Sequence, residues 1–84
     1  MKIGDIVISL AGHDSGKPFV VVATVSDNFV LIADGSSRGI ENPKLKRKRH
    51  LRVVAQSGIT DPTNAKLKKS IKQFNQERRL YAEK

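Results

Sequence analysis

Two runs of apolar and β-branched residues, separated by only three residues, constrain this chain most. Phe19–Val25 and Phe29–Ala33 favour extended strands, and Ser26-Asp27-Asn28 between them forms a short hairpin loop. The first run is apolar at odd and even positions alike, which is typical of a strand covered on both faces. We therefore expect an antiparallel hairpin whose first strand is buried from two sides.

Similar patterns predict three more strands. Ile6, Ile8 and Leu10 alternate with other residue types, and a glycine-rich turn at 12–16 follows them. Asp34-Gly35 is a strong two-residue hairpin signal, so we expect a short fourth strand at 38–40 and a fifth at 50–54. Five short strands joined by tight turns over residues 1–57 indicate a mainly β fold, a small antiparallel barrel.

Residues 58–84 have a helical pattern instead. Asp61 is expected to cap the helix, with Pro62 at its first position. Four apolar residues then recur at helical spacing and form one stripe: Leu67, Ile71, Phe74 and Tyr81. We expect this helix to pack on the barrel within one domain and to close the open side of a small core.

The positive charge is concentrated in the second half of the chain. The net charge is +8, from 16 Lys and Arg against 8 Asp and Glu. Residues 1–40 carry −1 of it, whereas residues 41–84 carry +9. This asymmetry excludes an acidic disordered domain and predicts a polyanionic partner, either nucleic acid or an anionic membrane surface.

The sequence offers no chemistry for catalysis. It has no cysteine, and its two histidines, His13 and His50, belong to no cluster with metal-ligand or relay spacing. Gly12–Lys17 has the two glycines and the lysine of a phosphate-binding loop. It is one residue too short between the glycines, and Pro18 stands where that motif requires Ser or Thr, so we reject this interpretation. We therefore expect no enzyme, no cofactor and no metal.

A membrane partner is disfavoured. The longest purely apolar run, Phe19–Ala23, is far shorter than the roughly 20 residues of a spanning helix. The apolar stripe of the expected helix is narrow, whereas interfacial helices present a broad apolar face. We therefore expect a cytoplasmic protein that does not bind membranes and is a monomer when free.

The order of these segments resembles a known family. Gly4-Asp5-Ile6-Val7, then Gly12–Lys17, then two apolar strands ending at Asp34-Gly35, is similar to the KOW motif. Three further features look like the archaeal and eukaryotic large-subunit ribosomal protein family L-fourteen-e and its short bacterial relatives. They are the run 26–31, the basic run 44–51 and the late lysine-rich helix.

This resemblance implies an SH3-like barrel that binds ribosomal RNA of the large subunit, with ribosomal proteins as possible neighbours. The chain would be a ribosomal component or a ribosome-associated factor of translation, within a ribonucleoprotein. The resemblance also implies that Gly16 lets an RNA backbone approach closely and that Lys17 contacts phosphate.

The basic run is the main candidate for RNA contact. If it is extended, Lys44, Lys46, Lys48 and Arg52 share one face, while Arg47 and Arg49 point the other way. The guanidinium groups of Arg47 and Arg49 suit bidentate or stacked contacts. The full set of expected RNA-binding residues is Gly16, Lys17, Lys44, Lys46, Arg47, Lys48, Arg49, His50, Arg52, Lys68, Lys69 and Lys72.

Base-specific recognition is not expected. Phe19, Phe29 and Phe74 lie at predicted core positions, so no aromatic platform for unstacked bases is visible. Recognition would then be of RNA shape and backbone, with strong salt dependence. Two alternatives stay open: the charged run and the helix lysines could be solvated surface, or the barrel could be a protein-interaction module of the transcription or translation machinery.

Overall fold

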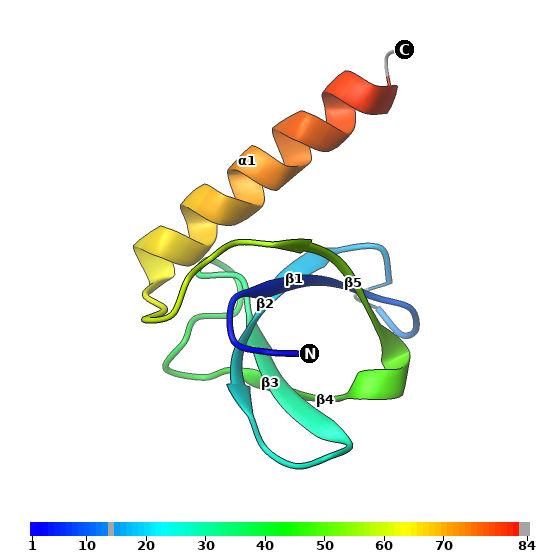
Figure 1. The fold of residues 1–84 in the computed structure, drawn as a ribbon, viewed down its shortest axis with the longest axis vertical. Helices are drawn as coiled ribbons and strands as arrows, with labels where there is room; N and C mark the ends of the chain where they lie inside the picture. The colour runs from blue at the N-terminus through cyan, green and yellow to red at the C-terminus, as the bar shows by residue number, and fades with distance from the viewer. Residues whose placement is uncertain (14, 83–84) are drawn as a thin grey trace.

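In this computed structural model, the two apolar runs form central strands of a five-stranded antiparallel sheet. The structure describes residues 1–13 and 15–82, with only the backbone for 79–82. The strands are β1 (Asp5–Ser9), β2 (Pro18–Thr24), β3 (Phe29–Ala33), β4 (Lys44–Arg47) and β5 (Leu51–Gln56). A short 3₁₀ helix, η1 (Lys48–His50), joins β4 to β5, and α1 (Asn64–Ala82) follows (Figure 1). The expected mainly β class with a C-terminal helix is confirmed.

The strands are arranged in the order β4-β3-β2-β1-β5. Figure 1 shows a strongly curved sheet whose two edge strands, β4 and β5, are connected through η1. In the described chain no pairing joins these two edges, so hydrogen bonds do not close the sheet. None of the described helices is long and apolar enough to cross a membrane.

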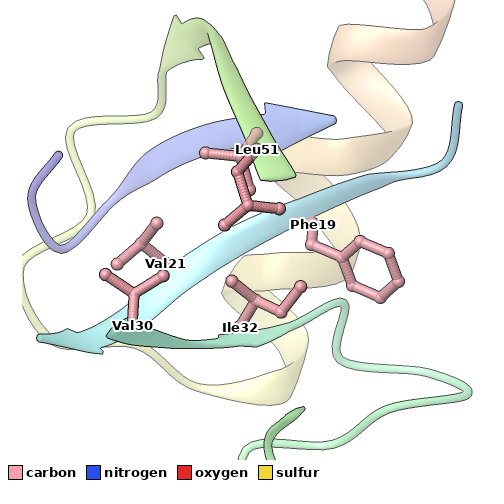
Figure 2. Close-up of a cluster of buried hydrophobic side chains, with 6 residues drawn as sticks. Phe19, Val21, Val30, Ile32 and Leu51 are labelled. Carbon is pink, nitrogen blue, oxygen red and sulfur yellow. The ribbon is translucent and has the colours of Figure 1, made fainter. Parts of the chain in front are cut away.

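One core lies on the inner face of the curved sheet. Its members come from four strands and are Val7, Phe19, Val21, Val30, Ile32 and Leu51, as Figure 2 shows for the five that it labels. Each of these side chains is at least nine-tenths buried. Burying a side chain of this size stabilises the fold by about 1.5–3 kcal/mol relative to exposure, before entropy costs.

A second core lies on the outer face, under the helix. Ile6, Val20 and Ala33 project from the sheet and pack with Leu67 of α1, and Ile71 and Phe74 extend the contact. β2 therefore contributes Phe19 and Val21 to one face and Val20 to the other, as its unbroken apolar run predicts. The helix therefore covers the outer face of the sheet. It does not close the open side of a single core, which is what the sequence predicts.

The expected strand at 38–40 is wrong, and Asp34-Gly35 does not form a two-residue hairpin. The Asp34 carboxylate accepts hydrogen bonds from the Ser36 and Arg38 amides, both at 2.8 Å, and from the Ser37 hydroxyl at 2.7 Å. Burial raises the pKa of the Asp34 carboxyl, but these hydrogen bonds outweigh it and hold the pKa below its usual value. The chain is thereby coiled into a loop that continues to β4, at Lys44–Arg47.

The helix also begins later than expected. Thr63, not Asp61, caps it, because the Thr63 hydroxyl accepts a hydrogen bond from the Lys66 amide at 3.2 Å. Asn64 ties this end to the loop before β4, since its side-chain oxygen accepts from the Ile40 amide at 2.9 Å. The side-chain amide of Asn64 donates to Glu41 at 3.0 Å, and this bond lowers the pKa of the Glu41 carboxyl. Leu67, Ile71 and Phe74 form the expected packing stripe, whereas the side chain of Tyr81 lies outside the described residues.

Candidate nucleic-acid interface

The short helix η1 is fixed at both ends to neighbouring loops. The Lys48 amide donates to the Asn28 carbonyl in the β2–β3 turn at 2.8 Å. The His50 carbonyl accepts from the Leu10 amide, at the start of the β1–β2 loop, also at 2.8 Å. Within η1, the Leu51 amide returns to the Lys48 carbonyl. Backbone hydrogen bonds therefore fix the position of η1 relative to two other loops.

This turn carries a positive charge that no described carboxylate compensates. Arg47 and Arg49 are exposed, and Lys48 and His50 are half-buried. Among the residues that the structure describes, no Asp or Glu lies within ion-pair distance of Arg47, Lys48 or Arg49. Neighbouring like charges repel one another, so an anion bound here relieves an unfavourable arrangement. We call Arg47, Lys48 and Arg49 the basic turn.

The basic turn borders a small pocket. Asn28, Arg47, Lys48 and Arg49 line a cavity of about 150 Å³. This volume is smaller than the roughly 300–1,000 Å³ of pockets for drug-sized ligands, so it suits a phosphate or part of a base. The exposed Asn28 side chain makes no hydrogen bond within the described chain, which leaves both its donor and its acceptor available.

Phe29 lies next to this pocket and not in the core, which corrects the sequence-based expectation. Phe29 is directly opposite Arg47 in the β3–β4 ladder, and residues opposite each other project from the same face. The Arg47 Cζ atom is 5.1 Å from the centre of the Phe29 ring, within the range of a cation–π contact. Phe29 is half-buried and belongs to neither buried cluster.

Lys44 and Lys46 project from the other face of β4. They lie opposite Ile32 and Val30, whose side chains are in the inner core, and both lysines are half-buried. The expected alternation with Arg47 is therefore present over β4 itself. It does not extend to Lys48 and Arg52, because η1 interrupts the extended chain.

The glycine loop, at residues 12–17, lies next to the C-terminal end of η1. Ser9, where β1 ends, pairs with Leu51, which directly follows η1, and the Gly16 amide donates to the Ser9 carbonyl at 2.9 Å. Gly16 has φ +83°, and no described atom lies within 4 Å of where a Cβ would be, so the space beside it is open to a partner.

Lys17 and Arg52 lie near the end of β1, one on either side of it. Ile8 pairs with Pro18 on one side and Arg52 on the other, which places Pro18 and Arg52 two strand spacings apart, roughly 10 Å. Lys17, which precedes Pro18, is exposed, as is Arg52. The strand register places the glycine loop where β2 begins and Arg47 beside the start of β3, where β2 ends. The two are connected through η1, whose backbone is hydrogen-bonded to the β2–β3 turn and to Leu10.

The helix lysines form a separate basic region. Lys68, Lys69 and Lys72 are exposed on α1, and two of them, Lys68 and Lys72, line a hollow with Asp34. Figure 1 shows α1 and η1 on opposite sides of the sheet. The structure therefore does not join these lysines to the basic turn, and their contact with RNA stays a prediction.

Sequence reasoning missed Asn28 and Phe29 as parts of this site. The sequence predicts a turn at Asn28 and a core position for Phe29, whereas their proximity to the basic run depends on the β3–β4 register. The alternation of Lys and non-Lys residues over 44–47 was the available signal for a strand there.

Comparisons with known proteins add no identification: neither a scan against protein-family models nor a search of curated proteins found a match for this chain.

Within residues 1–13 and 15–82, no three His, Asp or Glu side chains gather as a metal site would require. The fold and the site together define a class: a curved five-stranded antiparallel sheet with a packed C-terminal helix and an exposed basic turn.

Proposed function

We propose that this chain binds structured RNA through the basic turn and the adjoining glycine loop. The observation that carries the proposal is the basic turn: three cations without carboxylate partners in the described chain, on a backbone hydrogen-bonded to two loops. Phosphates of an RNA backbone are the natural counterpart, because cations positioned in advance lose little freedom on binding and release counterions from the RNA.

The partner and the setting are proposed from the sequence resemblance. They are ribosomal RNA of the large subunit, contacted by a ribosomal component or a ribosome-associated translation factor in the cytoplasm. The fold type proposed is an SH3-like barrel of the KOW kind. The curvature of the sheet and the connection of its edge strands by η1 support this type (Figure 1). The open space beside Gly16 supports close approach of an RNA backbone there.

The test compares two variants that each lose three positive charges. One replaces Arg47, Lys48 and Arg49 with Gln, and the control replaces Lys68, Lys69 and Lys72 with Gln. Binding to a fluorescent stem–loop RNA is measured by anisotropy between about 50 and 200 mM salt. We expect the first variant to bind weakly and its log–log salt slope to become shallower by about 2 to 3, because each lost phosphate contact removes about 0.7–0.9.

The control should bind RNA nearly as the native protein does, because its lysines lie on the opposite side of the sheet from the basic turn. Equal affinities and salt slopes for the two variants would contradict the proposal, since they would assign binding to net charge alone. Circular dichroism spectra of both variants, compared with that of the native protein, check that they are folded.

A protein-interaction module is the second candidate, favoured by one specific observation. Leu10, whose amide bonds to η1, is 53% exposed, and Leu45 of β4 is 54% exposed. Exposed apolar side chains beside a loop are typical of a protein contact. Such binding would change little with salt, so the same titration separates the two functions.

A further inference from the structure

The pocket beside the basic turn combines groups that a phosphate alone does not require. Lys48 and Arg49 provide positive charge, but Asn28, which has a side-chain amide, and Arg47, which has a guanidinium, also line the pocket. The guanidinium lies over the ring of Phe29, with the Arg47 Cζ atom 5.1 Å from the ring centre. The residues that line this small space therefore include one with a planar group, one with a neutral hydrogen-bonding group and two other cations.

Arg47 is suited to stack on a flat ligand. A guanidinium plane has two faces, and the Phe29 ring can cover only one of them. Arg47 is exposed, which leaves the rest of the group accessible, and the ring of Phe29 limits the orientations that it samples. Unpaired bases in RNA stack on guanidinium planes of this kind as well as on aromatic rings.

Asn28 is held where it can reach the edge of such a ligand. Its carbonyl accepts the Lys48 amide at 2.8 Å and its own backbone nitrogen donates to the Ser26 hydroxyl at 3.3 Å. The backbone of Asn28 is thus fixed by two hydrogen bonds while its side chain has none in the described chain. A primary amide both donates and accepts, which complements a base edge and, for adenine, allows two hydrogen bonds.

We infer that this pocket receives one unpaired nucleotide of the bound RNA. The base stacks on Arg47, its edge meets Asn28, and the flanking phosphates contact Lys48 and Arg49. The inference rests on the proposed RNA-binding function and adds a ligand class to it: RNA with a bulged or looped-out nucleotide. It replaces the expectation of recognition by shape and backbone alone, because Phe29 is at the site and not in the core.

The experiment uses two stem–loop RNAs that differ only by one unpaired adenosine in the stem. The native protein is expected to bind the bulged RNA roughly 5- to 150-fold more tightly than the fully paired RNA, the contribution of one stacked base. Arg47→Lys keeps the positive charge but removes the planar group. This variant should bind both RNAs with similar affinity and keep the native salt dependence on the paired RNA.

Arg78→Lys is the matched control. Arg78 also lies over a phenylalanine ring, with its Cζ atom 5.4 Å from the centre of Phe74, but on α1 and away from the pocket. This control should keep the preference for the bulged RNA. Phe29→Leu is the second variant of the site and should lose the preference as Arg47→Lys does.

Each other result has a separate meaning. Equal, salt-dependent binding of the native protein to both RNAs would overturn the nucleotide pocket and leave the proposed function intact. A preference that survives in Arg47→Lys would overturn the assignment to this pocket. Binding of the native protein to neither RNA would overturn the proposed function as well.

Discussion

Gly35 shows how one residue allows the helix to approach the sheet. It follows β3 with φ +80°, a conformation that costs residues with a Cβ about 1–2 kcal/mol. A Cβ at Gly35 would also collide with the Asn64 carbonyl oxygen and lie 3.0 Å from the Leu67 Cβ. Both neighbours belong to the first turns of α1. Because Gly35 has no side chain, the helix can occupy the space that a Cβ would fill.

Comparing Gly35→Ala with Gly16→Ala separates two destabilising effects of an added side chain: the strain of a positive φ and the collision with neighbouring atoms. Gly16 has nearly the same φ, +83°, but no described atom lies within 4 Å of where its Cβ would be. Gly16→Ala should lower the free energy of unfolding by about 1–2 kcal/mol. Gly35→Ala should cost about 1–3 kcal/mol more, because it also overpacks the helix contact. Urea unfolding followed by circular dichroism measures both, and equal losses would contradict the close packing.

At the scale of the secondary-structure elements, the hydroxyl group of Thr63 determines where α1 begins. Thr63 accepts the Lys66 amide through its side chain and the Leu67 amide, at 2.9 Å, through its carbonyl. Asp61 lies further out: its carboxylate is 3.9 Å from the Lys66 ammonium and 90% of its side chain is exposed. An ion pair so exposed contributes little, so the cap is the stronger determinant of where the helix begins.

Thr63→Ala should therefore lower the free energy of unfolding by about 1 kcal/mol, the usual cost of losing an N-cap. Asp61→Ala is the comparison and should change it by less than about 0.5 kcal/mol. Thermal unfolding of the two variants gives both values. A larger loss of unfolding free energy in Asp61→Ala than in Thr63→Ala would show that Asp61 caps the helix, as the sequence predicts.

The stability of the molecule as a whole depends on two cores that share one sheet. β2 provides Phe19 and Val21 to the inner core and Val20 to the outer core, so neither core is independent of the other. Leu67 is completely buried against the outer face. The helix and the sheet should therefore unfold in one cooperative step.

Leu67→Ala should cost about 2–5 kcal/mol, because it leaves a cavity between α1 and the sheet. That is a large part of the roughly 5–15 kcal/mol that stabilises a typical domain. Leu45→Ala removes the same atoms from a side chain that is 54% exposed and should cost much less. Hydrogen exchange should show faster opening of β2 amides in Leu67→Ala. Loosening confined to α1 would contradict a shared cooperative unit.

Local sequence patterns were sufficient to predict the segments that become buried. Phe19–Val25, Phe29–Ala33 and the alternation after Asp5 indicated β2, β3 and β1, because apolar periodicity reports burial directly. The same periodicity predicted the packing stripe of the helix. The uneven charge located the basic run, and turn residues located the glycine loop.

Contacts between distant segments, in contrast, determine the position of β4 and the geometry of the site. Lys44–Arg47 has no apolar pattern and is a strand because it pairs with the edge of β3. That register, not local sequence, places Arg47 over Phe29 and the basic turn beside Asn28. The same long-range packing separates the helix lysines from the basic turn. The sequence could not predict this separation, because the charge of a residue does not indicate on which face of a sheet it will lie.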